Sequence, residues 1–281
     1  MSKQTLLLQI HRDLVAGNVQ LPALPRVSLK VKEAAADPDQ DIESLSQIVQ
    51  VDPAFCGYLI RIANSPLYRR TSALSNVGQA LGRLGMETTR NLAMTYAVRS
   101  VFSARNRFMA RWLEQLWKQT IMTAALAHIM AERCSHLDTE EALMAALFQD
   151  IGALPLIEKA SKYPELLKDD EAVKWLIAKY SATVGVAILH HWGLGKHIQE
   201  VARSREDWMR VHEGEADLAD LITLARLHSY IGTSAMKTLP RINEIPAFHK
   251  LSLGEVGPSQ SFEFVDIAKE RIQQIRQALV A

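Results

Sequence analysis

The sequence predicts an all-α, multi-helical protein, and its length favours one continuous body with two lobes. Apolar residues recur at helical spacing, helix start signals stand before these stretches, and no segment shows the alternation of a half-buried strand. With 281 residues, 48% of them hydrophobic, the chain can bury a substantial core and does not have the composition of a disordered protein.

The stretch DPAFCGYLIRIANSP predicts one helix together with both of its ends. Asp52 can accept a hydrogen bond from the first turn, and Pro53 suits the first helical position because the N–H that it lacks would be unpaired there. The helix must end near Asn64, because Ser65 precedes Pro66 and that position resists the helical backbone. The side chains expected on its buried face are Phe55, Leu59 and Ile62.

Signals for helix starts and ends recur along the rest of the chain. Gly85 can end a helix by adopting a positive φ, and Asp138 with Glu141 three residues later predicts a helix start. The inner face before Gly85 should consist of Val77, Ala80, Leu81 and Leu84. Further helices are expected over 88–102, 107–134, 139–149, 171–191, 215–232 and 262–279. Pro and Gly residues predict an extended connection over 240–261. The last helix should dock on the body through Ile272, Ile275 and Leu279.

Charge is balanced over the whole chain but uneven along it. Lys and Arg number 32 against 31 Asp and Glu, so no overall field favours a polyanionic partner. Between Arg61 and Lys118, however, stand ten cations and two acids, which gives this segment +8 and the remainder −7 of the total of +1. Clustered arginines could bind phosphates of nucleic acid or of a small anionic ligand. The alternative is a solvated surface, with Trp112 and Trp117 anchoring the core.

Composition also bears on the compartment. Cys56 and Cys134 lie in apolar stretches without metal-type spacing, which is typical of thiols kept reduced. No stretch reaches the roughly 20 apolar residues that a membrane helix needs, and the N-terminus has only a short apolar run. We therefore expect a soluble, cytoplasmic protein with no membrane partner.

The stretch ALFQDIGALPL resembles the helix-to-turn element of the HD phosphohydrolase superfamily, in which a His-Asp pair holds a metal. Longer stretches resemble, in the same order, one branch of that superfamily, the HDOD (HD-related output domain) family. They are LPALPRV, IVQVDPAFCGYLIRIANSPLY, VGQALGRLGM, LWKQTIMTAALAHIM, TVGVAILHHWGL and LADLITLARLH, from about Leu21 to about Gly232. The resemblance implies an N-terminal helical lobe over 1–105, an HD-like helical lobe with a closing helix over 106–281, and a regulatory role.

The resemblance also places four metal-ligand positions in this chain. Gln119 and Gln149 stand where the family pattern has His, and Arg226 stands where it has a closing Asp. Asp150 keeps its carboxylate, but one carboxylate cannot by itself hold a transition metal against water, so we expect no metal, no cofactor and no catalytic residue. The guanidinium of Arg226 could take the metal's electrostatic place and pair with Asp150, which should then stay ionised. Alternatively, Arg226 points to solvent and Asp150 merely caps a helix.

The histidines are not expected to restore such a site. His190 and His191 are consecutive on a helix, so their side chains point about 100° apart and should not bind one ion. His128 lies on the apolar helix AALAHIM, where a hydrogen-bonded core imidazole is expected. Structural or surface roles are likewise expected for His136, His197 and His228.

The resemblance and the replaced ligand positions together imply a non-enzymatic bacterial signal-transduction module that binds a signalling protein, with a small anionic ligand as a second candidate partner. Exposed apolar residues along the connections 66–76 and 103–110 would support protein binding. Two alternatives stay open. One is a metal-dependent phosphohydrolase of the HD superfamily, and the other is a nucleic-acid-binding regulator that uses the basic segment 61–118.

Overall fold

The structure is a computed structural model that describes residues 12–13, 21–68, 73–102, 104–251 and 269–280, and every regular element in these ranges is helical. The predicted all-α class is therefore confirmed. The first half contains α2 (Arg26–Ala36), α3 (Ile42–Gln50), α4 (Pro53–Asn64) and α5 (Val77–Val101). The second half contains α6 (Arg107–Ala131), α7 (Thr139–Phe148), α8 (Ala153–Ala160), α9 (Asp170–His191), α10 (Lys196–Arg203), α11 (Leu218–Ser229), η1 (Ser234–Thr238), η2 (Ile242–Glu244), α12 (Pro246–Leu251) and α14 (Lys269–Val280).

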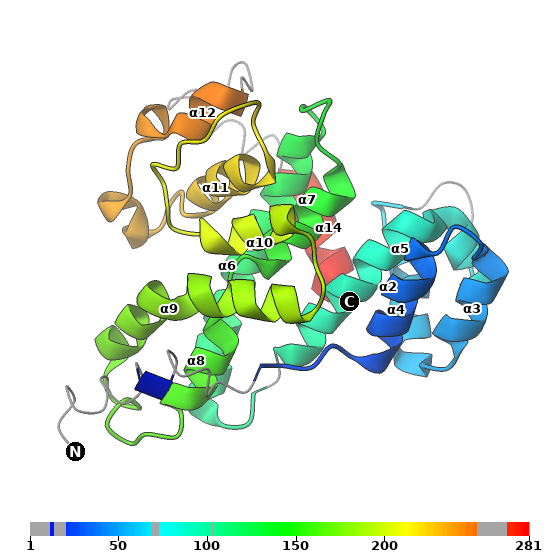
Figure 1. Ribbon diagram of the computed structural model, residues 1–281, viewed down its shortest axis with the longest axis horizontal. Helices are drawn as coiled ribbons and strands as arrows, with labels where there is room; N and C mark the ends of the chain where they lie inside the picture. The colour runs from blue at the N-terminus through cyan, green and yellow to red at the C-terminus, as the bar shows by residue number, and fades with distance from the viewer. Residues whose placement is uncertain (1–11, 14–20, 69–72, 103, 252–268, 281) are drawn as a thin grey trace.

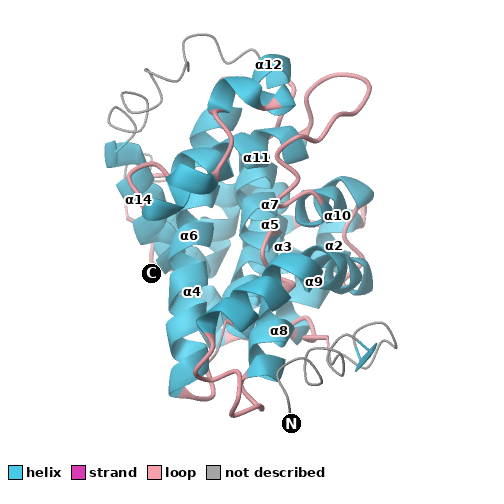
Figure 2. Ribbon diagram, turned by 90° about the vertical axis from the view of Figure 1, so that its left-hand side faces the viewer, coloured by secondary structure: helices cyan, strands magenta, loops and turns pink. Residues whose placement is uncertain are grey.

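The helices of the first half gather at one end of the molecule, where α2, α3 and α4 pack on α5 (Figure 1). The long helix α6 organises the second half through contacts with α7, α11 and α14. Figure 2 shows α14 beside α6, and the side chains of Ile272 and Ile275 are buried there. The predicted docking of the closing helix is confirmed for these two residues, while the side chain of Leu279 lies outside the described part.

Buried apolar side chains form two clusters, one from Val27 to Ala93 and one from Met94 to Ile275. Helix α5 contributes to both clusters, because the change from one to the other falls within it. This arrangement is compatible with two lobes. The bounds 1–105 and 106–281 remain a prediction.

The predicted helix ends follow from local hydrogen bonds. A carboxylate oxygen of Asp52 accepts the N–H of Phe55 at 3.0 Å, and one of Asp138 accepts the N–H of Glu141 at 2.7 Å. Gly85 adopts φ 78° and interrupts α5, as expected of a glycine at a helix end. The residues predicted for the two inner faces are all buried: Phe55, Leu59, Ile62, Val77, Ala80, Leu81 and Leu84.

Other expectations were wrong. The segment 240–261 is not simply an extended connection, because its described part contains η2 and α12. Pro246 occupies the first position of α12, where a proline suits a helix, and Ala247 and Leu251 turn into the core. Helix α11 begins at Leu218 instead of residue 215, because the carboxylate of Asp217 caps it. The helices α2, α3, α8 and α10 were not predicted. The expected connection over 240–261 and the expected closing helix over 262–279 both extend into residues 252–268, which lie outside the described residues.

One helix meets the length and composition of a membrane span, contrary to the expectation that no segment would. Helix α9 has 22 residues, but 56% of its most apolar window is buried inside the protein. It packs on α8 and α10. A buried core helix of a globular protein has the same composition, so this feature is weak support for a membrane span.

Candidate functional site

The candidate site forms where three segments distant in sequence meet around Asp150. Gln149 ends α7, and Asp150 follows it in the turn that leads into α8. Arg226 lies in the last turn of α11, and Arg205 stands two residues after the end of α10. The side chain of Asp150 is completely buried, so its charge must be compensated by protein groups.

Two guanidinium groups compensate the carboxylate of Asp150. Arg205 donates from Nε at 2.7 Å and places Nη2 at 2.5 Å from the same oxygen, Oδ1. Arg226 donates from Nη1 to the other oxygen, Oδ2, at 2.7 Å, and also to Oε1 of Gln149 at 3.0 Å. Each carboxylate oxygen therefore faces a different arginine. The pairing of Asp150 with Arg226 that the sequence predicted is present, and Arg226 does not point to solvent.

The outer side of the two arginines is also occupied. Glu206 places Oε1 at 2.8 Å from Nη1 of Arg205 and at 3.7 Å from Nη2 of Arg226. The hydroxyl of Tyr230 accepts a hydrogen bond from Nη2 of Arg226 at 3.3 Å, and the Tyr230 ring lies 5.8 Å from the guanidinium carbon. Two cations and two anions balance within the cluster.

The protonation states follow from this geometry. Burial by itself would raise the pKa of Asp150, but the charges of Arg205 and Arg226 and their hydrogen bonds outweigh it and lower the pKa to about 2. Burial would likewise lower the pKa of Arg226, but the charge of Asp150 raises it above the ordinary value. Asp150 is therefore an ionised carboxylate at neutral pH.

Stability should fall in acid because of this carboxylate. Its pKa is about 2 in the folded protein against an ordinary 3.8, so the folded state binds the proton less readily than the unfolded chain. The resulting stabilisation is fully present above about pH 4 and is lost as the pH falls towards about 2, with a total near 2 kcal/mol. Urea unfolding across this range would measure the loss. The Asp150→Asn protein should lack this component, and an unchanged pH dependence in that variant would contradict the assignment.

Gln119 does not join the cluster. Its amide Nε2 donates to the hydroxyl of Ser229 at the end of α11, and that hydroxyl donates to the carbonyl of Arg226 at 2.6 Å. Among the described residues, Gln119 makes no hydrogen bond to Gln149, Asp150 or the Arg226 side chain. The structure therefore brings together three of the four predicted positions and places the fourth beside them.

The donor set at these positions does not suit a divalent cation. A metal would need several free carboxylate or imidazole ligands around one point. Here both oxygens of Asp150 accept from guanidinium groups, and Gln149 offers an amide oxygen that is also engaged by Arg226. Arginine carries a permanent positive charge, so a cation placed here would meet electrostatic repulsion.

The sequence reading missed Arg205. It lies 55 residues from Asp150 in the charged stretch SREDWMR, which has no feature that marks one of its cations as buried. The side chain of Arg205 is 4% exposed. The charged run after α10 was the one available signal, and only the packing of α10 shows which arginine turns inward.

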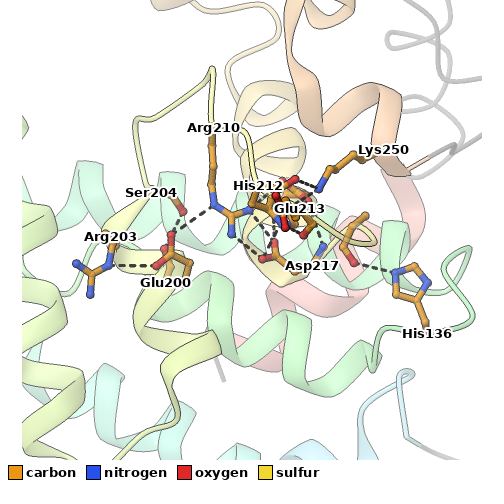
Figure 3. Close-up of polar contacts among 11 residues, drawn as sticks. His136, Glu200, Arg203, Ser204, Arg210, His212, Glu213, Asp217 and Lys250 are labelled. Carbon is orange, nitrogen blue, oxygen red and sulfur yellow. Dashed lines mark hydrogen bonds and ion pairs between the residues drawn. The ribbon is translucent and has the colours of Figure 1, made fainter.

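A second polar cluster, also missed, lies near the start of α11 and includes His212, Asp217 and Asp220. These three residues place possible ligand atoms within 4.8 Å of one another. Figure 3 shows Arg210 reaching between Glu200 and Asp217, with two hydrogen bonds to Asp217 at 2.6 and 2.9 Å. Arg210 also donates to Asp220 at 3.0 Å, and Lys250 lies 3.0 Å from His212 Nε2. Cations of the protein already compensate these carboxylates, so we assign the cluster to fixing the loop before α11.

The other histidines have the structural or surface positions that the sequence predicted. His190 and His191 are exposed. His128 is buried as predicted, but the predicted hydrogen bond of its ring is not present: Nε2 lies 3.5 Å from Glu140, and Nδ1 has no hydrogen-bond partner among the described residues. His136 contacts the carbonyl of Ala216 at 2.9 Å. His197 pairs with Glu141, and His228 contacts the carbonyl of Leu224.

Exposed apolar residues along 66–76 and 103–110 would have supported protein binding, but those exposed in the described parts are small: Pro66, Ala73, Ala104 and Ala110. No large apolar side chain is exposed there. Leu67, Tyr68 and Leu74 are half-buried against the two apolar clusters. The large apolar side chains that are exposed lie elsewhere: Leu29, Ile42, Val51, Leu167, Trp175, Met209 and Val211. The expected sign of a partner surface is therefore missing at these two places.

Several cations of the basic segment 61–118 have acidic partners. Arg105 pairs with Glu158 at 3.1 Å, and Arg111 pairs with Asp170 at 2.5 Å. Lys118 pairs with Glu114 at 2.6 Å. Trp112 and Trp117 pack against the second apolar cluster, as predicted for core anchors. These pairs reduce the positive field that a nucleic-acid backbone would require.

Comparison with known proteins gives a family and a fold. Residues 21–208 match the family described as HDOD domain. A proposed metal-dependent phosphohydrolase from Shewanella amazonensis SB2B has a TM-score of 0.82 at 24% identity over 98% of each chain. An HDOD domain protein of unknown function from Geobacter sulfurreducens has a TM-score of 0.71 at 21% identity, over 97% of this chain and 96% of its own.

A third solved structure, a proposed signal transduction protein from Marinobacter aquaeolei VT8, has a TM-score of 0.65 at 19% identity. The match covers 93% of this chain and 60% of that one. No curated protein matches this sequence. At such identities the solved structures show a shared fold, and the function must be argued from the site.

Proposed function

Because the chain belongs to the HDOD family, we propose that it is a non-enzymatic bacterial regulatory module that acts by binding a signalling protein. In this proposal the metal centre of its hydrolase relatives has been replaced by buried ion pairs. The observation that carries the proposal is the pair of guanidinium groups on the two oxygens of Asp150. They supply the positive charge that a metal would supply, but they offer no open coordination position at which water could be activated.

The buried ion pairs also suggest what the site does in place of catalysis. They connect the turn after α7 with the segment after α10 and with α11. Buried ion pairs add little net stability compared with apolar packing, and in some proteins they select one arrangement of the segments that carry them. We propose that the cluster holds the helices in a fixed orientation so that their outer surfaces can be recognised by the partner.

The remaining candidate is a metal-dependent phosphohydrolase, which is the proposed activity of the Shewanella protein of the same fold. Elemental analysis of the purified full-length protein, combined with a phosphodiesterase assay in added Mn²⁺, separates the two. We expect substoichiometric transition metal and no turnover above the Mn²⁺ blank. Stoichiometric metal together with turnover that a chelator abolishes would contradict the non-enzymatic proposal.

Metal without turnover would need to be located. In that case Asp220→Asn should remove the metal if it binds beside His212, whereas it should remain if the ion binds at Asp150. Retention of metal in Asp220→Asn would point back to the cluster around Asp150 and would count against its replacement by ion pairs.

A further inference from the structure

A pocket of about 210 Å³ lies beside the second apolar cluster, between it and helix α2, whose buried side chains belong to the first cluster. Helices α2 and α5 form one side of it, and α7 with the turn between α9 and α10 forms the other. The apolar part of the wall consists of Met94, Met144, Leu194 and Ile198.

The ammonium group of Lys32 lies in this pocket without a carboxylate partner among the described residues. Its one described hydrogen bond is to the carbonyl of Trp192, at 2.7 Å. An ammonium group has three N–H donors, so this contact leaves part of its capacity unused. Burial lowers the pKa of Lys32, which means that the charged form is incompletely solvated here. An anion would relieve that deficit.

The backbone makes room for this side chain. Gly193 adopts φ 64°, and a Cβ atom at that position would lie 2.7 Å from Nζ of Lys32. Glycine therefore allows both the left-handed turn after α9 and the approach of the ammonium group to it. Trp192 in the same turn donates from its indole to the carbonyl of Pro22 at 2.8 Å, which further ties the turn to the segment before α2.

A second cation, Arg90 of α5, lines the same pocket and is loosely held. Its contacts to Glu87 and Asn91 are long, at 3.3 and 3.4 Å, and the carboxylate of Glu87 is 73% exposed. One carboxylate, that of Glu141, also lines the pocket, and it contacts Nε2 of His197 at 2.8 Å. The two cations, Lys32 and Arg90, outnumber this single carboxylate in the pocket wall.

We propose that this pocket binds a small organic anion, with one phosphate or carboxylate group on a compact apolar body. The anionic group would lie between Lys32 and Arg90, where both can donate charge-assisted hydrogen bonds. The apolar body would contact Met94 and Met144, whose flexible thioether side chains adapt to different shapes. The first turn of α10, which lacks a side-chain cap, adds a favourable dipole at the edge of the pocket.

Another pocket in the described part of the chain does not have this character. It has a volume of about 320 Å³ and lies between the segment 21–23 and the helices α5, α6 and α8. Its cation, Arg105, is already paired with Glu158 at 3.1 Å. Of these two pockets, the one at Lys32 therefore has a cation without a carboxylate partner among the described residues. A ligand there would touch elements of both apolar clusters, which is a position from which it could change their relative stability.

The proposal goes beyond the regulatory role and is tested on the full-length protein by NMR, with backbone amide shifts followed during a titration. The probes are n-butyl phosphate, n-butyrate and the uncharged n-butanol. We expect saturable shifts at the amides of Gly193 and Gly195 with at least one of the two anions and none with butanol. The stronger of the two anions then identifies the preferred head group.

Variants localise the site. Lys32→Met and Arg90→Met keep apolar stems but remove one cation each, and each should weaken binding about tenfold, the value of one charge-assisted hydrogen bond. Lys30→Met, on the same helix but exposed, is the matched control and should bind as the wild type. If Lys32→Met fails to fold, as judged by its melting curve, the anion affinity of Arg90→Met decides whether the pocket is the binding site. No saturable binding by either anion, equal binding of butanol, or unchanged affinity in the folded variants would overturn the proposal.

Discussion

Asp150→Asn should destabilise the protein by about 3–5 kcal/mol, the typical cost of removing one partner from a buried ion pair. The variant keeps the size of the side chain but removes the charge that faces Arg205 and Arg226. Both guanidinium groups are nearly inaccessible, at 4% and 3% exposure, so water cannot replace the lost carboxylate. Urea unfolding followed by circular dichroism, with linear extrapolation to water, measures the change.

The matched control is Asp170→Asn. Asp170 pairs with Arg111 at 2.5 Å, but both side chains are about half exposed, at 46% and 48%. Exposed ion pairs contribute about 1 kcal/mol or less, so the same substitution should cost far less there. Equal losses in the two variants would show that the Asp150 cluster is solvated. Adding Arg226→Met to Asp150→Asn should recover part of the loss, because it removes one uncompensated buried charge.

Gly152→Ala should destabilise the protein by about 3 kcal/mol or more, at or above the upper end of the usual cost of overpacking. Gly152 begins the turn into α8, two residues after Asp150, where α8 crosses α9. A Cβ atom at Gly152 would lie 2.0 Å from the carbonyl oxygen of Ser181 and 2.4 Å from the amide nitrogen of Gly185. Both are backbone atoms, so no side-chain rotation can relieve the clash, and the two helices would have to separate. Thermal and urea unfolding measure the loss.

Gly82→Ala is the control for this substitution. Gly82 lies on the exposed side of α5, and an added Cβ there would meet no atom within 4 Å. Alanine is the better helix former, so this variant should be more stable than the wild type by about 0.5–1 kcal/mol. A neutral Gly152→Ala would mean that the crossing of α8 and α9 is looser than the structure has it. The position of Asp150 would then not depend on this contact.

Local chemistry explains the parts of the fold that the sequence predicted. The starts of α4 and α7 depend on Asp52 and Asp138, each of which bonds an amide three residues away. The break at Gly85 depends on one residue's freedom to adopt a positive φ. Helices α2, α8 and α10 have no side-chain cap, and they were missed because tertiary packing decides that they form. Helix α3 was missed although the carboxylate of Asp41 caps its start.

The candidate site likewise has a part that was predictable from the sequence and a part that depends on tertiary packing. The sequence by itself determined the all-α class, the starts of α4 and α7, the break at Gly85 and, through its resemblance to a hydrolase superfamily, that Gln149, Asp150 and Arg226 occupy related positions. Only the tertiary structure decided that Arg205 is the second arginine on the carboxylate of Asp150 and that Gln119 bonds to Ser229 instead. It also decided that Lys32 and Arg90 line one pocket. The physical reason is range: a cap involves residues a few positions apart, whereas these charges meet across 55 residues or more because packed helices exclude water between them.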